Sequence, residues 1–209
     1  MHVVSASRRL VAPLALTVAL LVLGTGSAHA SLLVADGENC GEYSASQVFL
    51  PWNDVANYTL APGGNFESPK YGWDSNSTSR VNDDNEPYYV GDEKDHSSLS
   101  IGSGGFATSP AMCVGLAEPD VRVFFKQTSG SPFAGLRVEA LFDDADGQTH
   151  SVSVGVLGGS RAWTLSPPMA IVANLLPLLD DGTPVAFRFT AVGGSFAIDD
   201  LYVDPWGRG

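Results

Sequence analysis

Apolar and polar residues alternate in several short runs in the C-terminal two-thirds of the chain. The clearest run covers residues 136–142, where apolar side chains alternate with Arg137 and Glu139. A period of two places the apolar side chains on one face of a strand, and Gly, Pro, Asn and Asp bound these runs as turn residues do. The pattern predicts strands over residues 121–125, 136–142, 151–156, 185–190 and 195–203.

The segments between these runs are interpreted from their polarity and turn residues. Residues 75–95 are the most polar stretch, and we expect long loops there around a short strand at residues 88–90. Asp143–Gly147 predicts a hairpin turn with Asp-Gly at its tip. A helical turn or two is expected at 170–179, because Pro177 would end a longer helix. No helical stripe persists for three turns after residue 30, so the sequence predicts an all-β fold, an antiparallel β-sandwich.

Residues 1–30 have the three parts of a secretory signal peptide. Arg8 and Arg9 form a short basic region, residues 10–23 are an apolar run, and small residues with an A-x-A site end at Ala30. A membrane-spanning helix would need about 20 apolar residues. We therefore expect cleavage after Ala30, a secreted and extracellular protein, and no membrane insertion after cleavage.

The remaining 31–209 segment is strongly acidic. It contains nine Lys and Arg residues against 23 Asp and Glu residues, a formal net charge of −14. This charge argues against nucleic acid and anionic membrane surfaces as partners, because neutralising phosphate requires Lys and Arg. It fits solubility outside the cell or cation binding. The length fits one domain with a substantial core.

Cys40 and Cys113 are the two cysteines of the chain. A pair of cysteines in an exported protein predicts a disulfide, which would tie an N-terminal arm at residues 31–60 to the body of the domain. Closing such a long loop is worth about 4 kcal/mol in the chain-entropy model. With no C-x-x-C motif and no neighbouring His cluster, we expect neither a metal nor a redox role for these cysteines.

Two motifs far apart in the sequence resemble carbohydrate-binding modules. Residues 62–67 (Pro-Gly-Gly-Asn-Phe-Glu) with Tyr71-Gly72-Trp73 resemble the opening motif of families 4, 9 and 22, and residues 195–203 resemble their closing strand. The resemblance implies a galactose-binding-like jelly roll over residues 61–209, with adjacent first and last strands. The chain also resembles a group of secreted actinobacterial proteins that share its PAMCVG segment and VDPW end.

The same resemblance implies a structural calcium ion where the two motifs meet. Its ligands would be Glu67, Asp199 and Asp200, which suits an ion that takes six to eight oxygen ligands. The alternative is that these carboxylates are solvated or cap loops through backbone N–H groups. The six acidic residues between Asp83 and Asp95 are interpreted as a solvated loop.

Aromatic side chains would carry carbohydrate binding by stacking on sugar rings. Tyr88, Tyr89 and Trp163 lie beside turns and polar stretches and are the candidate ligand-binding residues, whereas Trp73 is expected in the core. The chain has no G-x-S-x-G and no H-E-x-x-H motif, so no catalytic residue is proposed.

The sequence therefore favours a secreted, non-catalytic module that binds carbohydrate or a cell-envelope component. A structural or protein-interaction domain without a small ligand is the alternative. A polysaccharide hydrolase is a third reading, because a catalytic carboxylate pair is defined by its separation in space and not by a motif.

Overall fold

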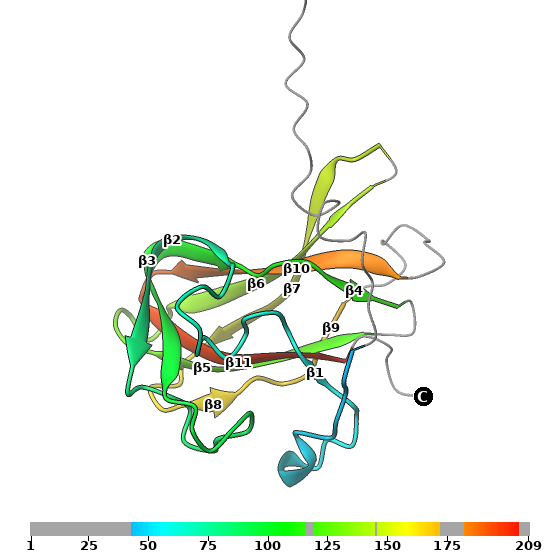
Figure 1. The fold of residues 1–209 in the computed structure, drawn as a ribbon. Helices are drawn as coiled ribbons and strands as arrows, with labels where there is room; N and C mark the ends of the chain where they lie inside the picture. The colour runs from blue at the N-terminus through cyan, green and yellow to red at the C-terminus, as the bar shows by residue number, and fades with distance from the viewer. Residues whose placement is uncertain (1–42, 116–118, 145, 172–181, 205–209) are drawn as a thin grey trace, which may run out of the picture.

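The computed structural model describes residues 43–115, 119–144, 146–171 and 182–204. Figure 1 shows these residues as strands in two layers, with a short 3-10 turn, η1 (Leu50–Trp52), beside the lower layer. The strands are β1 (Thr59–Leu60), β2 (Asp74–Asn82), β3 (Ser97–Thr108), β4 (Met112–Val114), β5 (Asp120–Gln127), β6 (Gly135–Asp143), β7 (Thr149–Gly158), β8 (Thr164–Leu165), β9 (Met169–Ala170), β10 (Thr183–Val192) and β11 (Phe196–Asp204).

Strand β3 joins the two layers. Its first half pairs antiparallel with β11, where Leu99 lies opposite Ile198, and its second half pairs antiparallel with β10. Strand β2 runs alongside β3 through the same bend. A Cβ atom at Gly105 would lie 2.7 Å from the carbonyl oxygen of Asn76, so glycine is required for this close approach. The sheet path β7-β6-β10-β3-β11-β5-β8 thereby curls over itself.

The hydrophobic core fills the space between the two layers. Trp73 is 8% exposed, and its ring stacks on Phe189 with the centroids 6.0 Å apart. Phe66, from the opening motif, meets the Trp73 ring edge-on at 4.9 Å. The expected core position of Trp73 is confirmed. Burying a large apolar side chain of this kind stabilises the fold by about 1.5–3 kcal/mol.

The first and last strands of the fold lie side by side. Strand β1 pairs antiparallel with β11, with Thr59 opposite Val203 and Leu60 opposite Tyr202. All strand pairs in the described residues are antiparallel, and the strands form two packed layers. The predicted all-β jelly-roll sandwich is confirmed.

Residues 43–58 cover the outer side of the layer formed by β5 and β11. Phe49 and Tyr58 are fully buried and form a second apolar cluster with Phe124 of β5 and Tyr202 of β11. The Phe49 ring lies edge-on to Tyr58 at 4.9 Å and to Tyr202 at 5.4 Å. This part of the predicted N-terminal arm therefore packs as a constituent of the folded unit.

Two local predictions for residues 75–95 are wrong. Residues 74–82 form strand β2, which was missed because both of its faces are polar and its hydrogen bonds run to β3 alone. Residues 88–90 form a turn and not a strand. The carboxylate of Glu86 accepts hydrogen bonds from the backbone N–H groups of Tyr88 and Val90, at 2.5 and 2.7 Å, which holds the turn.

The other strand predictions agree with the structure. The five alternating runs lie within β5, β6, β7, β10 and β11, except that the last run begins one residue before β11. The hairpin turn predicted at Asp143–Gly147 connects β6 and β7, and Gly147 has the positive φ of 73° that such a turn requires.

Several predictions fall on residues that the structure does not describe. The signal peptide at residues 1–30, Cys40, and most of the helical turn expected at 170–179 lie outside the described residues. Cys113 is buried on β4, and no described cysteine is a free thiol. Its pairing with Cys40 stays a prediction. None of the described segments forms a helix long and apolar enough to cross a membrane.

Candidate functional site

The outward side of β2, the second half of β3, β10, β6 and β7 is a polar surface, called here the exposed sheet face. The strand register determines which side chains lie together on this face, because residues opposite each other in an antiparallel pair point to the same side of the sheet. Val138, Phe187 and Ala107 point into the core, so their chain neighbours point outward. One row across the five strands is Asp74, Thr108, Arg188, Glu139 and Ser153. The next row is Asn76, Phe106, Thr190, Arg137 and Val156.

The polar side chains of the exposed sheet face hold one another in place. Glu139 accepts hydrogen bonds from Arg137 Nε at 3.1 Å and from Ser151 Oγ at 2.9 Å. On the neighbouring strand, Arg188 Nε donates to Thr108 Oγ1 at 3.0 Å. These contacts fix guanidinium, carboxylate and hydroxyl groups on rigid strands. Such a surface is suited to hydrogen bonding with a polyhydroxylated ligand.

The end of this face nearest the β5–β6 turn is apolar. Val156 is 68% exposed and Val192 is 51% exposed. Val156 packs over Gly135, where a Cβ atom would lie 2.7 Å from the valine Cγ1. Phe133, in the turn that leads into β6, is 96% exposed. Exposed apolar side chains beside a polar row are the combination found in shallow ligand sites.

The aromatic residues expected to bind ligand lie in another part of the molecule, outside the β5–β11 layer. Tyr88 is 52% exposed, and its ring stacks on Phe124 at 5.5 Å with Trp52 edge-on at 5.1 Å. Trp163 is partly buried, and the Lys126 ammonium lies 4.6 Å from its ring centroid. One face of each of these two rings is therefore occupied by the protein itself.

Tyr89 differs from its neighbour Tyr88. It is 49% exposed, and its backbone has a positive φ of 51°. No aromatic ring contacts it among the described residues. Tyr88 and Tyr89 therefore share a surface loop, and Trp163 approaches that loop through the apolar cluster around Phe124.

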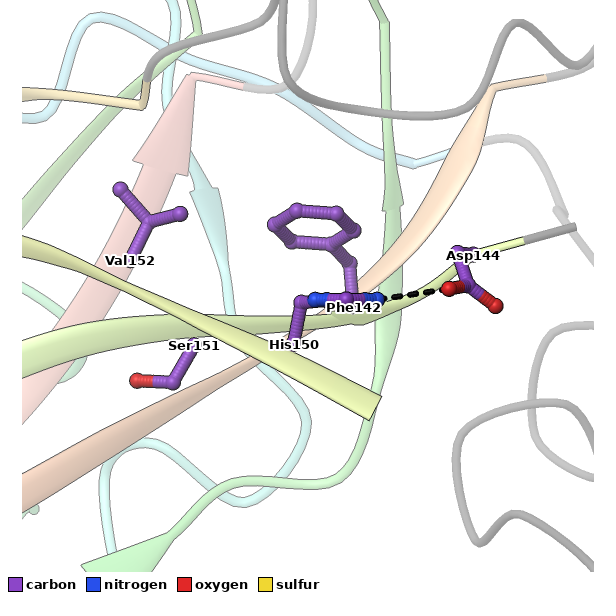
Figure 2. Close-up of a pocket in the computed structure, with 5 residues that line it drawn as sticks. All are labelled: Phe142, Asp144, His150, Ser151 and Val152. Carbon is purple, nitrogen blue, oxygen red and sulfur yellow. Dashed lines mark hydrogen bonds and ion pairs between the residues drawn. The ribbon is translucent and has the colours of Figure 1, made fainter. Parts of the chain in front are cut away.

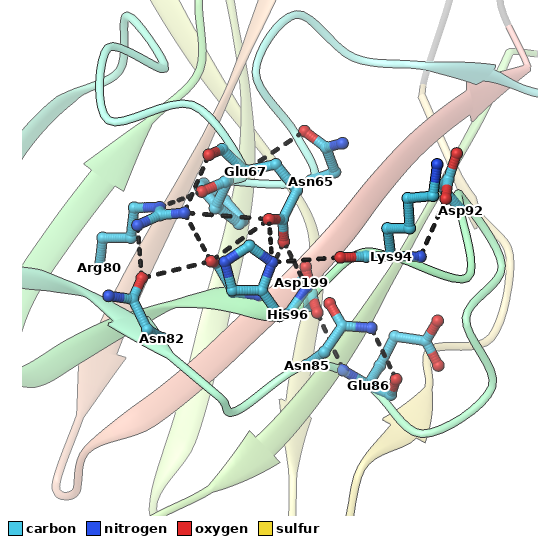
Figure 3. Close-up of polar contacts among 12 residues, drawn as sticks. Asn65, Glu67, Arg80, Asn82, Asn85, Glu86, Asp92, Lys94, His96 and Asp199 are labelled. Atoms are coloured by element: carbon cyan, nitrogen blue, oxygen red, sulfur yellow. Dashed lines mark hydrogen bonds and ion pairs between the residues drawn. The ribbon is translucent and has the colours of Figure 1, made fainter.

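The residues expected to bind calcium lie at a third location, under the loop between β2 and β3. Figure 3 shows Glu67 in contact with His96 and Arg80. Glu67 Oε1 accepts from the backbone N–H groups of His96 and Ser97 at 2.8 and 2.7 Å, and Glu67 Oε2 lies 2.9 Å from His96 Nδ1. Both carboxylate oxygens of Glu67 are thus engaged by the protein.

A β-bulge turns Asp199 and Asp200 toward the same loop. The register of β11 against β5 shifts between Asp199 and Tyr202, and Asp200 has a positive φ of 50°. Asp199 Oδ2 accepts from Glu86 N at 2.9 Å, and its Oδ1 accepts from Asp200 N at 2.9 Å. Both aspartates are buried, at 0% and 1% exposed.

Burial and mutual repulsion govern the protonation of this cluster. Burial, followed by the charge of Asp200, raises the pKa of Asp199 to about 9. Burial, followed by the charges of Glu86 and Asp95, raises the pKa of Asp200 to about 8. Burial also raises the pKa of Glu86 and of Asp95. Buried carboxylates at this density need a proton or a cation to neutralise them.

The donor chemistry of the cluster suits calcium, although no ligand set is assembled. Asp200 Oδ1 and Oδ2 and Asp95 Oδ2 are buried and accept no hydrogen bond of normal geometry, although the backbone N–H of Gly91 lies near enough to Asp200 to oppose the rise of its pKa. Gly91 keeps the space beside them open, since a Cβ atom there would lie 2.7 Å from Asp95 Oδ2 and 3.4 Å from Asp200 Oδ1. Across the described residues, no three His, Cys, Asp or Glu side chains converge as ligands of a metal ion. A calcium ion held by Glu67, Asp199 and Asp200 therefore stays a prediction.

An open pocket of about 260 Å³ lies at the β6–β7 hairpin (Figure 2). His150 Nε2 lies 2.7 Å from Asp144 Oδ2, and the His150 ring stacks on Phe142. Ser151 donates instead to Glu139, because neighbouring residues on a strand point to opposite faces. The serine, histidine and aspartate of this pocket are therefore not joined as a nucleophile, base and orienting acid.

Sequence reasoning missed two sets of residues in these sites. Glu86 and Asp95 belong to a stretch interpreted as a solvated loop, but they are 0% and 8% exposed, and nothing in their spacing distinguishes them from their acidic neighbours. The alternation in residues 136–142 and 185–190 does indicate that Arg137, Glu139 and Arg188 share the polar side of their strands. It does not reveal that β10 and β6 are neighbours.

Comparison with known proteins gives structural neighbours of low sequence identity. No protein-family model matches the chain, and no curated protein is similar to it. One similar structure is that of the CBM22-1-GH10 modules of Clostridium thermocellum xylanase 10B complexed with xylohexaose. That likeness has a TM-score of 0.47 and 13% identity, and covers 67% of this chain and 27% of that chain. This chain thus spans about a quarter of that structure.

Two further neighbours are single modules. The CBM22-1 xylan-binding domain of Paenibacillus barcinonensis Xyn10C has a TM-score of 0.46 and 13% identity, covering 66% of this chain and 87% of that chain. The family 11 carbohydrate-binding module of Clostridium thermocellum Lic26A-Cel5E has a TM-score of 0.43 and 12% identity, covering 74% and 98%. Family 22 is among the families that the motifs at residues 62–73 and 195–203 resemble. At these identities, the likeness does not extend to individual residues.

Proposed function

We propose that this chain is a non-catalytic carbohydrate-binding module whose ligand lies on the exposed sheet face. The observation that carries the proposal is the row Asp74, Thr108, Arg188, Glu139 and Ser153, which crosses five strands in register. Its hydroxyl, carboxylate and guanidinium groups are the donors and acceptors that sugar hydroxyls pair with.

The arrangement of this face supports an extended ligand. The apolar side chains of Val156 and Val192 lie at one end, and the polar rows run across the sheet from there. A sugar chain has apolar C–H faces and polar hydroxyl edges, so it can contact both kinds of surface at once. Rigid strands also reduce the ordering cost of binding, because few side chains must be immobilised.

The proposed place of action is outside the cell, on a polysaccharide or a glycan of the cell envelope. The signal peptide expected at residues 1–30 supports export, and the acidic surface of the remaining chain supports solubility there. The surface loop bearing Tyr88 and Tyr89, with Trp163 beside it, is the second surface on which glycan binding is to be tested.

The proposal is tested with a glycan array alongside a pull-down on insoluble polysaccharides. The purified protein is expected to bind at least one class of glycan, and heat-unfolded protein is the control for nonspecific adsorption. If the folded protein binds no glycan in either assay, the carbohydrate-binding function is wrong, and an interaction domain without a small ligand replaces it.

We also propose that a calcium ion stabilises the fold at the acidic cluster of Glu86, Asp95, Asp199 and Asp200, at whose edge Glu67 lies. The support is the set of buried oxygens of Asp200 and Asp95 that accept no hydrogen bond of normal geometry, and the space that Gly91 leaves beside them. An ion bound there would link β11 to the loop between β2 and β3. It would act on stability and would take no part in a reaction.

A further inference from the structure

Arg188 is held in one position on the exposed sheet face. Its Nε atom donates to Thr108 Oγ1 at 3.0 Å, and its guanidinium carbon lies 4.6 Å from the centroid of the Phe106 ring. Both partners belong to the neighbouring strand β3, so the guanidinium is held against that strand. A hydrogen bond together with a cation–π contact restricts the rotamers of this long side chain before any ligand arrives.

The charge of Arg188 is not neutralised by the protein. No carboxylate of the described residues lies within 4.0 Å of its nitrogen atoms, whereas Arg137 on the same face is paired with Glu139. The two Nη atoms of Arg188 have no hydrogen-bond partner among the residues that the structure describes. A chain with 23 acidic residues thus leaves a positioned arginine with its Nη groups free on its candidate binding surface.

We propose that Arg188 binds a carboxylate on the sugar ligand, so that the module recognises a glycan containing a uronic acid. This inference rests on the proposed carbohydrate-binding function and specifies its ligand class. The planar guanidinium presents two parallel N–H donors that match the two oxygens of a carboxylate. Thr108 occupies the Nε donor and Phe106 packs against the guanidinium, which leaves the Nη donors for this pairing.

The surroundings of Arg188 favour a ligand with few charges. Glu139 of β6 lies opposite Arg188. On the other side, Asp74 of β2 lies opposite Thr108 of β3. The positive site is therefore narrow and flanked by acidic residues. The net charge of −14 after residue 30 would repel a densely charged polyanion. A mostly neutral glycan with scattered carboxylates avoids this repulsion, whereas sulfate or phosphate esters at high density do not.

The test is a glycan array of matched pairs, in which a uronic acid in one oligosaccharide is replaced by its parent neutral hexose in the other, with sulfated versions alongside. Titration calorimetry then measures affinity for the best pair. We expect at least tenfold tighter binding of the uronic acid member, and weakening of this preference at high salt. Arg188→Ala should remove the preference, and Arg188→Lys should retain only part of it, because lysine lacks the paired donors.

The control variant is Lys94→Ala, which removes one positive charge from an exposed loop residue away from this face. It should keep the full preference, and thermal melts of all variants show whether they are folded. Equal binding of both members of every pair would overturn the uronic acid inference and leave carbohydrate binding intact. A preference for the sulfated members would overturn the carboxylate assignment. Binding to no glycan would overturn the proposed function itself.

Discussion

Asp54 and Arg122 form a buried ion pair that joins the N-terminal segment to strand β5. Asp54 Oδ2 lies 2.8 Å from Arg122 Nη1, and the two side chains are 5% and 8% exposed. Tyr58 donates a second hydrogen bond to Asp54 Oδ2 at 2.9 Å, and Arg122 donates to the carbonyl oxygen of Ser166. Burial raises the pKa of Asp54, but the hydrogen bonds from Ala56, Tyr58 and Arg122 outweigh it and hold this pKa below its usual value.

Breaking this pair should destabilise the protein strongly. Asp54→Ala leaves the Arg122 guanidinium buried without its carboxylate, which is expected to lower the free energy of unfolding by about 3–5 kcal/mol. Arg137→Ala is the matched control, because the Arg137 side chain is 47% exposed and can be hydrated, so its pair with Glu139 is worth only about 0–1 kcal/mol. Denaturant unfolding monitored by tryptophan fluorescence measures both variants. Equal effects would show that the N-terminal segment does not depend on this contact.

The disulfide prediction concerns Cys40 and Cys113. Mass spectrometry of non-reduced peptides from the exported protein should find these two cysteines linked. Reduction should lower the melting temperature, because a loop of this length is worth about 4 kcal/mol in the unfolded chain. Cys113→Ala removes only the Sγ atom at this buried position and should melt close to the reduced wild type. Two free thiols in the exported protein would contradict the prediction.

The acidic cluster predicts an unusual dependence of stability on pH. The pKa of Asp199 is about 9 and that of Asp200 about 8, so the folded protein holds protons there that the unfolded chain releases near pH 4. Without a cation, stability should therefore fall as pH rises from about 4 to about 9. Asp200→Asn should reduce this slope, whereas Asp83→Asn, at an exposed position of the same loop, should not. Melts of the wild type that do not change over this range would contradict the raised pKa values.

Calcium should restore the stability that the cluster loses at high pH. A cation would compete with the protons of Asp199 and Asp200, so its effect should be larger at pH 8 to 9 than at about pH 5. A hundredfold excess over the dissociation constant is expected to add about 2.7 kcal/mol to the free energy of unfolding. Melts with excess calcium and with chelator measure the difference, and Asp200→Asn should abolish it. Superimposable melts of the wild type at every pH would exclude the ion.

Much of the fold could be predicted from the sequence, because five strands bury one face and expose the other. Strand β2 could not, since its polar residues give no period, and only the pairing with β3 makes it a strand. Residues 88–90 have aromatic and β-branched side chains that favour strands, yet the carboxylate of Glu86 satisfies their backbone N–H groups and holds a turn. The hydrogen bonds to the buried Glu86 carboxylate therefore outweigh the strand preference of these residues.

The candidate sites were less predictable than the fold. Asp199 and Asp200 were found from the closing motif, and the structure places them in a buried acidic cluster. Their neighbours Glu86 and Asp95 are more than 100 residues away in sequence, so no sequence motif predicts that these four residues lie together. Arg188 likewise lies between Glu139 and Thr108 because β10 is placed between β6 and β3. The alternation of apolar and polar residues within each strand does not predict this strand order.

Glycan binding by the exposed sheet face can be measured by comparing two sets of variants in calorimetric titrations with a glycan identified on the array. Arg137→Ala and Asn76→Ala change that face, and Tyr88→Ala and Trp163→Ala change the aromatic surface outside the β5–β11 layer. Losing a hydrogen bond to a charged group is worth about 1.5–3 kcal/mol, so at least Arg137→Ala should bind tenfold or more weakly, while its melting temperature falls only by the small amount that the pair with Glu139 contributes. We expect the sheet-face variants to lose affinity, while Tyr88→Ala and Trp163→Ala retain it. Full binding by the sheet-face variants, with affinity lost in Tyr88→Ala or Trp163→Ala, would contradict this expectation.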